Sequence, residues 1–475
     1  MFPMLVFFTL QQDSLIGVCL QLYVMQLIPN QCDYVKEKML QELRLKDIED
    51  LFSDIPDEVK TTSLNLPDSL TQMEVERKLK NLAEKNKPFP QLLSFLGGGI
   101  KPHYIPPVVR AILNRSEFYT SYTPYQAEVS QGFLQAMFEY QSIITELTGM
   151  EVANCSLYDG STALGEAALM SVRVTKRETI VIPANISWEK KLVLINYMKG
   201  AGLKVEEVPY DVKTGMVNIN ALAQRVSHDT ACVYLENPNF FGIFEEQVLK
   251  IAEITSEKNS LLVVGIDPLS LGITKSPGSY GADIVIGEGR SLGNSMNYGG
   301  SSLGFFACRK KFIRKMPGRI IGLTYDSDGN RTFCMTLQTR EQHIRREKAT
   351  SNICTNQGLC ALAAVVYLST LGSKGLVELS KNNFRKGQIF AEKLCSLPWF
   401  KKTFTGTHFN EFVVQSSQDV GFLNKKLLEK DIQGGLPIER WYPALENCLL
   451  FGVTELHTQE DMDKLVATIK EVYHV

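Results

Sequence analysis

The chain has 475 residues, of which 44% are hydrophobic and 21% charged, and its net charge is −2. This composition is typical of a soluble globular protein and excludes a chain that is disordered over most of its length. Fifty basic residues stand against 52 acidic ones. Such a balance predicts no nucleic-acid partner and no attraction to an anionic membrane. The length predicts two or three domains.

The first 24 residues are mostly apolar, but no basic residue occurs before Lys36, and Asp13 interrupts the run. A secretory signal needs a positively charged start, and a membrane-spanning helix needs about 20 apolar residues without such a break. One interpretation is an extension, which either packs on the core or is poorly ordered. The other is that translation starts at Met25 and that these residues precede the protein. We favour the start at Met25.

Ten cysteines are scattered along the chain without a C-x-x-C pair, and no two of the six histidines are spaced as metal ligands on one helix. Isolated cysteines in apolar runs are typical of buried thiols in a reducing compartment. We therefore expect a cytoplasmic protein without a metal site.

Residues 25–150 are predicted to form a helical N-terminal segment whose helices are joined by polar loops. The apolar period and capping residues indicate four helix starts. These starts are Asp33, Thr71-x-x-Glu74, Pro106-Pro107 and Ser130.

Residues 151–355 alternate short runs rich in Val and Ile with helical stretches, which predicts βαβ units and a mainly parallel sheet in a large α/β domain. The expected strands are 179–183, 204–208, 231–235, 261–266, 283–286 and 303–308. The expected helices are 161–174, 187–199, 219–226 and 245–257.

Residues 356–475 are predicted to form a connecting helix and a smaller α+β domain. The connecting helix is expected over 356–371, and strands over 412–415 and 448–453. Thr458-x-x-Asp461 is a capping box for a final helix.

Two stretches imitate ligand motifs without meeting their requirements. Residues 287–293 follow a predicted strand, but a dinucleotide fingerprint belongs at the first strand and must open a helix. Asp326-x-Asp328-x-Asn330 begins like a calcium loop, but Arg331 and Leu337 stand where an EF-hand needs Gly and Glu. We expect a hairpin turn there, between strands at 320–324 and 332–337.

Two other signals point to one cofactor. Gly160-Ser161-Thr162 opens a predicted helix, where free N–H groups and hydroxyls can bind a phosphate, although an ordinary helix cap is the alternative. Asp267 directly follows the strand 261–266, at the edge of a parallel sheet where ligands bind. In this order they favour a pyridoxal-phosphate fold, in which the carboxylate pairs with the pyridinium nitrogen.

The lysine that such enzymes need is missing. It should follow the strand at 283–286 and form the Schiff base with the cofactor, but Arg290 stands near that place. A guanidinium stays protonated and forms no imine. Lys275 precedes the strand, and Lys310 comes one strand too late. The sequence thus predicts the fold without the residue that anchors the cofactor.

Longer stretches resemble the P-protein family of the glycine cleavage system, specifically the lysine-lacking subunit 1 of its two-subunit form, the glycine dehydrogenases (decarboxylating). The resemblance extends from Met25 to the C-terminus. Its most specific segments are SFLGGG at 94–99, YTSYTPYQ at 119–126, VSQG at 129–132, YDG at 158–160, DPLSLG at 267–272, YGAD at 280–283 and LQTREQHIRR at 337–346.

The resemblance implies an α/β pyridoxal-phosphate-dependent transferase-like fold of the aspartate aminotransferase type. It implies that subunit 2 holds pyridoxal phosphate on its lysine, that this chain binds no cofactor covalently, and that this chain alone is inactive. Together the subunits would form a heterodimer, decarboxylate glycine and pass the aminomethyl group to the lipoyl H-protein. The T- and L-proteins of the same system are implied as further partners.

In such a complex, loops before the sheet would complete the pocket of subunit 2. The candidates are polar side chains near the glycine run at 97–99 and in the tyrosine-rich loop: His103, Tyr104, Tyr122, Thr123, Tyr125, Gln126 and Gln131. For His103, an ordinary surface position is the alternative. The chain's own degenerate cofactor pocket would contain Ser161, Thr162 and Asp267, with Arg290 near the lysine position.

Two other functions stay open at this point. A degenerate paralogue of a pyridoxal-phosphate enzyme could act as a non-catalytic regulatory or scaffold protein. A self-sufficient enzyme could use Lys275 as its Schiff-base lysine. A gene for a lysine-bearing subunit 2 would argue against the scaffold, and trapping the cofactor on Lys275 would establish the enzyme.

Overall fold

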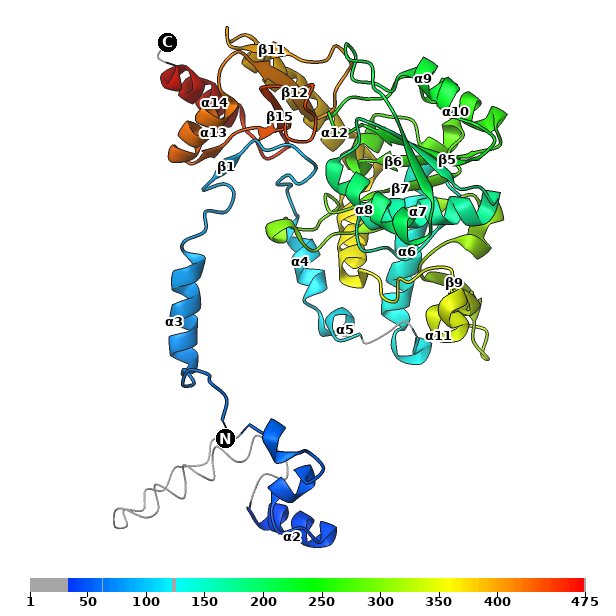
Figure 1. Ribbon diagram of the computed structural model, residues 1–475, viewed down its shortest axis with the longest axis vertical. Helices are drawn as coiled ribbons and strands as arrows, with labels where there is room; N and C mark the ends of the chain where they lie inside the picture. Colours follow the sequence, from blue (N-terminus) through cyan, green and yellow to red (C-terminus); the bar gives the residue numbers. More distant parts are fainter. Residues whose placement is uncertain (1–32, 62, 122–124, 474–475) are drawn as a thin grey trace. The chain divides into compact units, whose positions relative to one another are not determined.

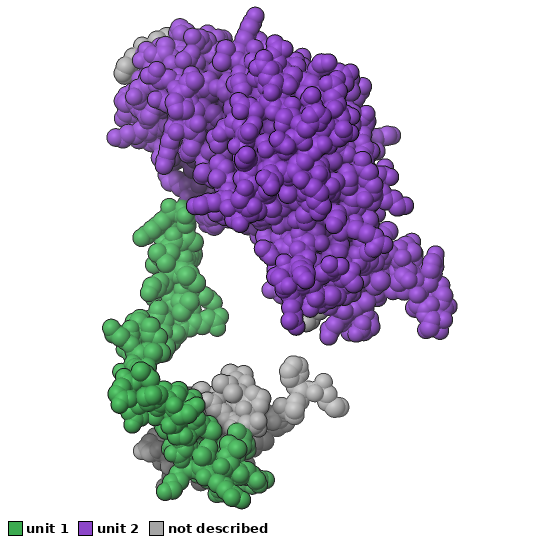
Figure 2. Space-filling model, turned by 45° about the vertical axis from the view of Figure 1, so that its right-hand side comes forward, with its two compact units in different colours: residues 1–86 green, residues 87–475 purple. Residues whose placement is uncertain are grey.

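The computed structural model describes residues 33–61, 63–121 and 125–473. The apolar stretch 1–24 and the expected start at Met25 lie outside the described residues. The chain divides into two compact units, residues 1–86 and 87–475, which have different colours in Figure 2.

The described residues of the first unit form helices that enclose no buried core. These are α2 (Asp33–Leu43), the 3-10 turns η1 (Ile48–Phe52) and η2 (Asp57–Val59), and α3 (Gln72–Ala83). The predicted capping box of α3 is confirmed, because the Glu74 N–H donates to the Thr71 hydroxyl and the Glu74 carboxylate accepts from the Thr71 N–H. No described residue between 33 and 86 is buried. The apolar side chains of this unit therefore remain exposed.

The second unit is built on a seven-stranded sheet with the order β2-β8-β7-β6-β5-β3-β4. As predicted, the sheet is mainly parallel; only β8 is antiparallel to its neighbours β7 and β2. The six predicted strands are confirmed within two residues at each end. The strands are β2 (Val152–Ala153), β3 (Thr179–Pro183), β4 (Lys204–Val208), β5 (Thr230–Asn237), β6 (Leu261–Ile266), β7 (Ile284–Glu288) and β8 (Gly304–Cys308).

Helices cover both faces of this sheet (Figure 1) because successive side chains of a strand point to opposite faces. Val181 and Val264 share a core with α6 and α12, whereas Ile180 and Val263 pack with α7 and α8. The helices of these layers are α4 (Pro107–Leu113), α6 (Gln131–Thr148), α7 (Gly160–Thr175), α8 (Trp188–Gly200), α9 (Ile219–Arg225), α10 (Val248–Glu257) and α12 (Gly358–Cys395). The four helices predicted within 151–355 are all present.

The domain boundary expected at residue 150 does not coincide with a boundary between the compact units. α6 buries Leu134, Met137 and Ile144 in the same core as the sheet and α12. The boundary between the units falls instead after Asn86. The periodicity of an amphipathic helix shows that one face is buried, but it does not show which layer covers that face.

A β-hairpin follows the sheet. β9 (Ile320–Tyr325) and β10 (Arg331–Thr336) pair antiparallel, and Asp326 accepts from the N–H groups of Asp328 and Asn330 at 2.9 and 2.8 Å. The prediction that this stretch is a hairpin turn is confirmed. Two short helices, α5 (Ser116–Tyr119) and α11 (Gln342–Arg345), interrupt the loops before α6 and after β10.

α12 joins the two parts of the second unit. Its first half, with Ala364, lies in the core under the sheet, and its last turns place Phe390 and Leu394 in a separate C-terminal core. Between them the backbone leaves helical geometry at Gly372, where φ is 64°. Within the described residues this is the one helix long and apolar enough to span a membrane, but 44% of its apolar stretch is buried in the protein. Such burial is typical of a core helix.

The C-terminal part is a smaller α+β domain with the antiparallel strand order β11-β12-β15-β14. Thr458 caps its last helix as predicted. Its elements are β11 (Phe400–Lys402), β12 (Glu411–Ser416), α13 (Val420–Glu429), β13 (Ile432–Gln433), β14 (Leu436–Pro437), β15 (Cys448–Gly452) and α14 (Gln459–Val472). β1 (Leu93–Ser94) pairs with β13. The segment around β1, which precedes the large domain in the sequence, therefore packs as part of the small C-terminal domain.

Aromatic packing fastens this segment in place. The Phe95 ring stacks on Phe390 at 4.9 Å and lies 5.0 Å from His457, and Phe390 meets Phe412 edge-on at 5.5 Å. These side chains are fully or almost fully buried. The aromatic cluster thus positions the glycine run that follows Phe95.

Phe390→Ala should lower the free energy of unfolding by about 3–5 kcal/mol, because it leaves a cavity among buried rings. Phe422→Ala on α13 is the matched control, since Phe422 is 49% exposed, and its effect should stay within about 0.5 kcal/mol. Urea denaturation of the full chain, followed by circular dichroism, measures both. Equal effects of the two substitutions would contradict the stabilising role of the cluster.

Candidate functional site

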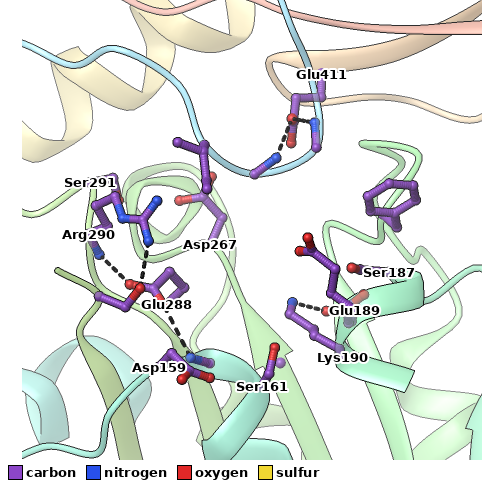
Figure 3. A pocket seen from close by; sticks show the side chains of 18 of the residues that line it. Asp159, Ser161, Ser187, Glu189, Lys190, Asp267, Glu288, Arg290, Ser291 and Glu411 are labelled. Carbon is purple, nitrogen blue, oxygen red and sulfur yellow. Dashed lines mark hydrogen bonds and ion pairs between the residues drawn. The ribbon is translucent and has the colours of Figure 1, made fainter. Parts of the chain in front are cut away.

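A cavity of about 690 Å³ lies within the second unit, at the carboxyl ends of β5, β6 and β7. This is the edge at which parallel sheets bind ligands. Figure 3 shows its charged and polar wall. The wall includes Asp159, Ser161, Ser187, Glu189, Lys190, Asp267, Glu288, Arg290, Ser291 and Glu411.

Asp267 stands directly after β6 and lines this cavity. Its carboxylate accepts from the Leu269 N–H at 3.0 Å and so caps the 3-10 helix η4 (Pro268–Gly272). The residue therefore has a structural function that does not depend on a cofactor.

Two carboxylates of the chain itself accept hydrogen bonds from the N–H groups at the N-terminus of α7. Asp159 accepts from the Thr162 N–H at 2.7 Å and from the Thr162 hydroxyl at 2.9 Å. Glu288 accepts from the Gly160 N–H at 3.1 Å, and burial raises the pKa of Glu288 above its ordinary value. The turn that contains Ser161 is thus a helix cap, which is the ordinary alternative for this pattern.

Arg290 follows β7, near the place of the missing lysine. Its Nη2 donates to the Gly299 carbonyl at 2.9 Å and to the Ser302 hydroxyl at 2.6 Å. Its Nε and Nη1 atoms are buried and have no hydrogen-bond partner among the described residues. The side chain is only 7% exposed, so its positive charge is both buried and unbalanced at hydrogen-bond distance.

These residues do not fit pyridoxal phosphate. No amine follows β7, and the guanidinium of Arg290 cannot form an imine. The phosphate would have to displace Glu288 from the Gly160 N–H and stand beside Asp159, whose like charge repels it. We therefore assign no chemistry of this cofactor to the cavity.

Two lysines line the cavity, and both are in ion pairs. Lys101 lies 3.0 Å from Glu411, and Lys190 pairs with Glu236. Burial alone would lower the pKa of Lys190, but the Glu236 carboxylate raises it above its ordinary value. A protonated amine cannot attack an aldehyde. Lys275 is exposed and does not line the cavity, which argues against a self-sufficient enzyme that uses it.

His103 lies on the cavity rim and has a local partner. Its Nδ1 is 3.1 Å from Glu455, whose carboxylate also accepts from the Tyr104 N–H at 2.7 Å. Burial alone would raise the pKa of Glu455, but the hydrogen bond and charge of His103 lower it to about 2. This contact fastens the loop to the small domain and leaves Tyr104 exposed.

Gln131 has a structural role within the fold. Its amide donates to the carbonyls of Ala127 and Phe333 and accepts from the Phe333 N–H. It therefore ties the start of α6 to the hairpin and does not line the cavity.

Tyr125 and Gln126 also lie away from the cavity wall. The Tyr125 hydroxyl accepts from Arg319 at 3.1 Å, and Gln126 is exposed before a 3-10 turn. Tyr122 and Thr123 lie outside the described residues.

Glu288 is absent from the residues predicted from the sequence, although it closes the expected phosphate site. It ends β7 inside the stretch 287–293, which is confirmed not to open a helix. A carboxylate at the carboxyl end of a parallel strand is the signal that could have identified it. Its contact with Gly160 spans 128 positions and has no local signature.

Comparison with known proteins supports the resemblance. The model of the glycine cleavage system P-protein family matches residues 26–469. A probable glycine dehydrogenase (decarboxylating) subunit 1 from Carboxydothermus hydrogenoformans is 49% identical over 446 residues, which cover 94% of this chain and 99% of that protein. The protein of the same name from Thermococcus kodakarensis is 47% identical over 447 residues, covering 94% and 98%.

Solved structures agree. A crystal structure of inhibitor-bound glycine decarboxylase (P-protein) of the glycine cleavage system is 39% identical, with a TM-score of 0.87 and coverage of 94% of this chain and 99% of that one. Glutamate decarboxylase from Lactobacillus brevis, 12% identical with a TM-score of 0.65 over 89% and 97% of the chains, shows the fold alone. The predicted pyridoxal-phosphate-dependent transferase-like fold is thereby confirmed. The chain belongs to the glycine cleavage system P-protein family.

Proposed function

We propose that the chain is subunit 1 of a glycine dehydrogenase (decarboxylating). It works with a lysine-bearing subunit 2 to decarboxylate glycine and to transfer the aminomethyl group to the lipoyl group of H-protein. The observation that carries this proposal is a P-protein relationship over 94% of the chain combined with a cavity that does not fit the cofactor. A P-protein fold that cannot hold the cofactor needs a partner that can.

In this proposal subunit 2 holds the pyridoxal phosphate, which supplies an electron sink for decarboxylation when it is bound. The arrangement of Arg290 and Glu288 supports this division, because it offers neither an amine nor a free helix N-terminus. This chain alone is then inactive.

The chain completes and closes the pocket of subunit 2 with loops that precede the sheet. The N–H groups of Gly98 and Gly99 both donate to Glu411, at 2.7 and 3.0 Å, which holds the glycine run against the small domain. The proposed contacts with subunit 2 are His103, Tyr104, Tyr122, Thr123, Tyr125 and Gln126, while Gln131 positions α6 on the hairpin.

The exposed apolar side chains of the first unit support the presence of a partner. On α3 the exposed Val75, Leu79 and Leu82 share one face at i, i+4 and i+7. A continuous exposed apolar face of this kind marks an interaction site. We assign this surface to subunit 2. Its other exposed apolar side chains are Tyr34, Met39, Leu43, Ile48, Leu51, Phe52, Ile55, Val59, Leu64, Leu66, Leu70 and Met73.

The T- and L-proteins, which complete the glycine cleavage cycle, are proposed as further partners, and the cytoplasm as the location. The eight cysteines within the described residues are all unpaired, which fits a reducing compartment.

Leu79→Ser combined with Leu82→Ser should weaken binding of subunit 2 by about 100-fold or more. Each buried leucine contributes about 1.5–3 kcal/mol to an interface, and 1.4 kcal/mol is a factor of ten. The matched control is Arg77→Ser with Asn81→Ser, on the opposite face of α3. Isothermal titration with purified subunit 2 measures both variants. Wild-type affinity of the leucine variant would contradict the assigned surface.

Mixing experiments test the shared activity. The chain alone should bind no pyridoxal phosphate and should not exchange CO2 into glycine. Adding subunit 2 and H-protein should establish the exchange, and borohydride should then attach the cofactor to subunit 2 only. Arg290→Lys should not make this chain active alone, because an amine without a phosphate site is not held in a productive geometry.

The scaffold alternative predicts a different result. A non-catalytic paralogue would bind its partner without raising the rate of exchange. A cofactor label on any lysine of this chain, Lys275 above all, would refute the proposed division between the subunits.

A further inference from the structure

Arg290 is the one arginine of the cavity wall, and its guanidinium forms no ion pair with the described residues. Lys101 and Lys190 each pair with a carboxylate, whereas Nε and Nη1 of Arg290 have no partner among the described residues. The charge of Glu288 offsets part of this buried charge, but its carboxylate accepts from backbone N–H groups and leaves Nε and Nη1 of Arg290 unsatisfied. The unpaired guanidinium N–H groups of Arg290 therefore favour an anionic group from outside the chain.

The neighbours of Arg290 favour an anion with a single charge. Asp267 follows β6 and Glu288 ends β7, and these strands are hydrogen-bonded neighbours with Ile266 opposite Gly287. A phosphate dianion would meet both acidic side chains. A carboxylate carries one charge and is planar, and it accepts hydrogen bonds well from a guanidinium.

The acidic side chains of the cavity wall can bind a positively charged group of the same ligand. Two lysines and His103 line the cavity in pairs with carboxylates. The other charged side chains of the wall are one cation and four acids: Arg290, Asp159, Glu189, Asp267 and Glu288. In Figure 3 the side chains of Arg290 and Asp267 both point into the cavity. A molecule with a carboxylate beside an ammonium matches this arrangement.

We propose that the cavity binds a free α-amino acid, with its carboxylate on Arg290 and its ammonium on Asp267. The site is contained in this chain and is distinct from the cofactor site assigned to subunit 2. Its volume of about 690 Å³ admits amino acids that carry side chains. The cavity at the carboxyl edge of the sheet thereby remains a binding site in this subunit, but it binds an amino acid in place of pyridoxal phosphate.

Binding is measured on the full chain without subunit 2, so that the result does not depend on the proposed function. The twenty common amino acids are screened by thermal shift, because a ligand that binds the folded state raises the melting temperature. The amino acid with the largest shift is then radiolabelled and its bound amount measured by equilibrium dialysis. We expect one site per chain. No shift with any of the twenty would overturn the proposal.

Acetate and methylammonium each carry one half of the ligand and should bind roughly tenfold more weakly or worse, since each lacks one charge-assisted hydrogen bond. Acetate that binds as tightly as the amino acid would show a simple anion site. Pyridoxal phosphate that binds in preference would show a remnant cofactor site. Either result would overturn the assignment.

Arg290→Met should lower the affinity for the amino acid roughly tenfold or more. Asp267→Asn can still cap η4, and it should reduce the affinity for the amino acid to that for acetate while acetate binds unchanged or more tightly. Misfolding cannot produce this selective loss. Arg385→Met, at an exposed position of α12, is the control and should bind like the wild type. Wild-type affinity of the Arg290→Met variant would refute the proposal.

Discussion

The carboxylate of Glu288 on the first N–H of α7 governs the chemistry of the cavity. A helix N-terminus carries partial positive charge that a phosphate can use, and here a side chain of the protein uses it. The same carboxylate accepts from the N–H groups of Arg290 and Leu303, so it ties α7 to both ends of the turn between β7 and β8. Burial raises the pKa of Glu288 because it penalises the charged form, and the three backbone hydrogen bonds offset part of this penalty.

Several residues that resemble parts of a cofactor site have structural functions of their own. Asp267 caps η4, and Asp159 caps α7. A cap of this kind stabilises a helix by about 0.5–2 kcal/mol. These side chains are therefore useful to the fold with or without a cofactor. Their presence in the sequence correctly indicates the fold. The arginine at position 290, where such enzymes have a lysine, shows that this chain cannot form the Schiff base.

The small domain and the segment that precedes the sheet form the wall of the cavity that faces the strand ends and α7. Glu411 on β12 holds the N–H groups of Gly98 and Gly99 and pairs with Lys101. Both glycines have positive φ, 102° and 94°, which residues with a side chain rarely adopt. At Gly242 a Cβ would lie 1.9 Å from the Glu411 carbonyl, so the chain from β5 can approach β12 only as glycine. The cavity thus exists only when both domains are packed together.

The sequence alone determined the parallel strands, the position of Asp267 after β6 and the lack of a lysine after β7. Apolar runs such as 179–183 and 261–266, set between helical periods, identify strands locally, and the order of the strands then places the residues that follow them. Only the tertiary structure decided that α6 belongs to the core under the sheet, that Glu288 occupies the terminus of α7, and that Gln131 binds the hairpin. The last two contacts join residues 128 and 202 positions apart. A local pattern shows that a side chain is polar or apolar, but the partner it meets depends on how distant elements pack.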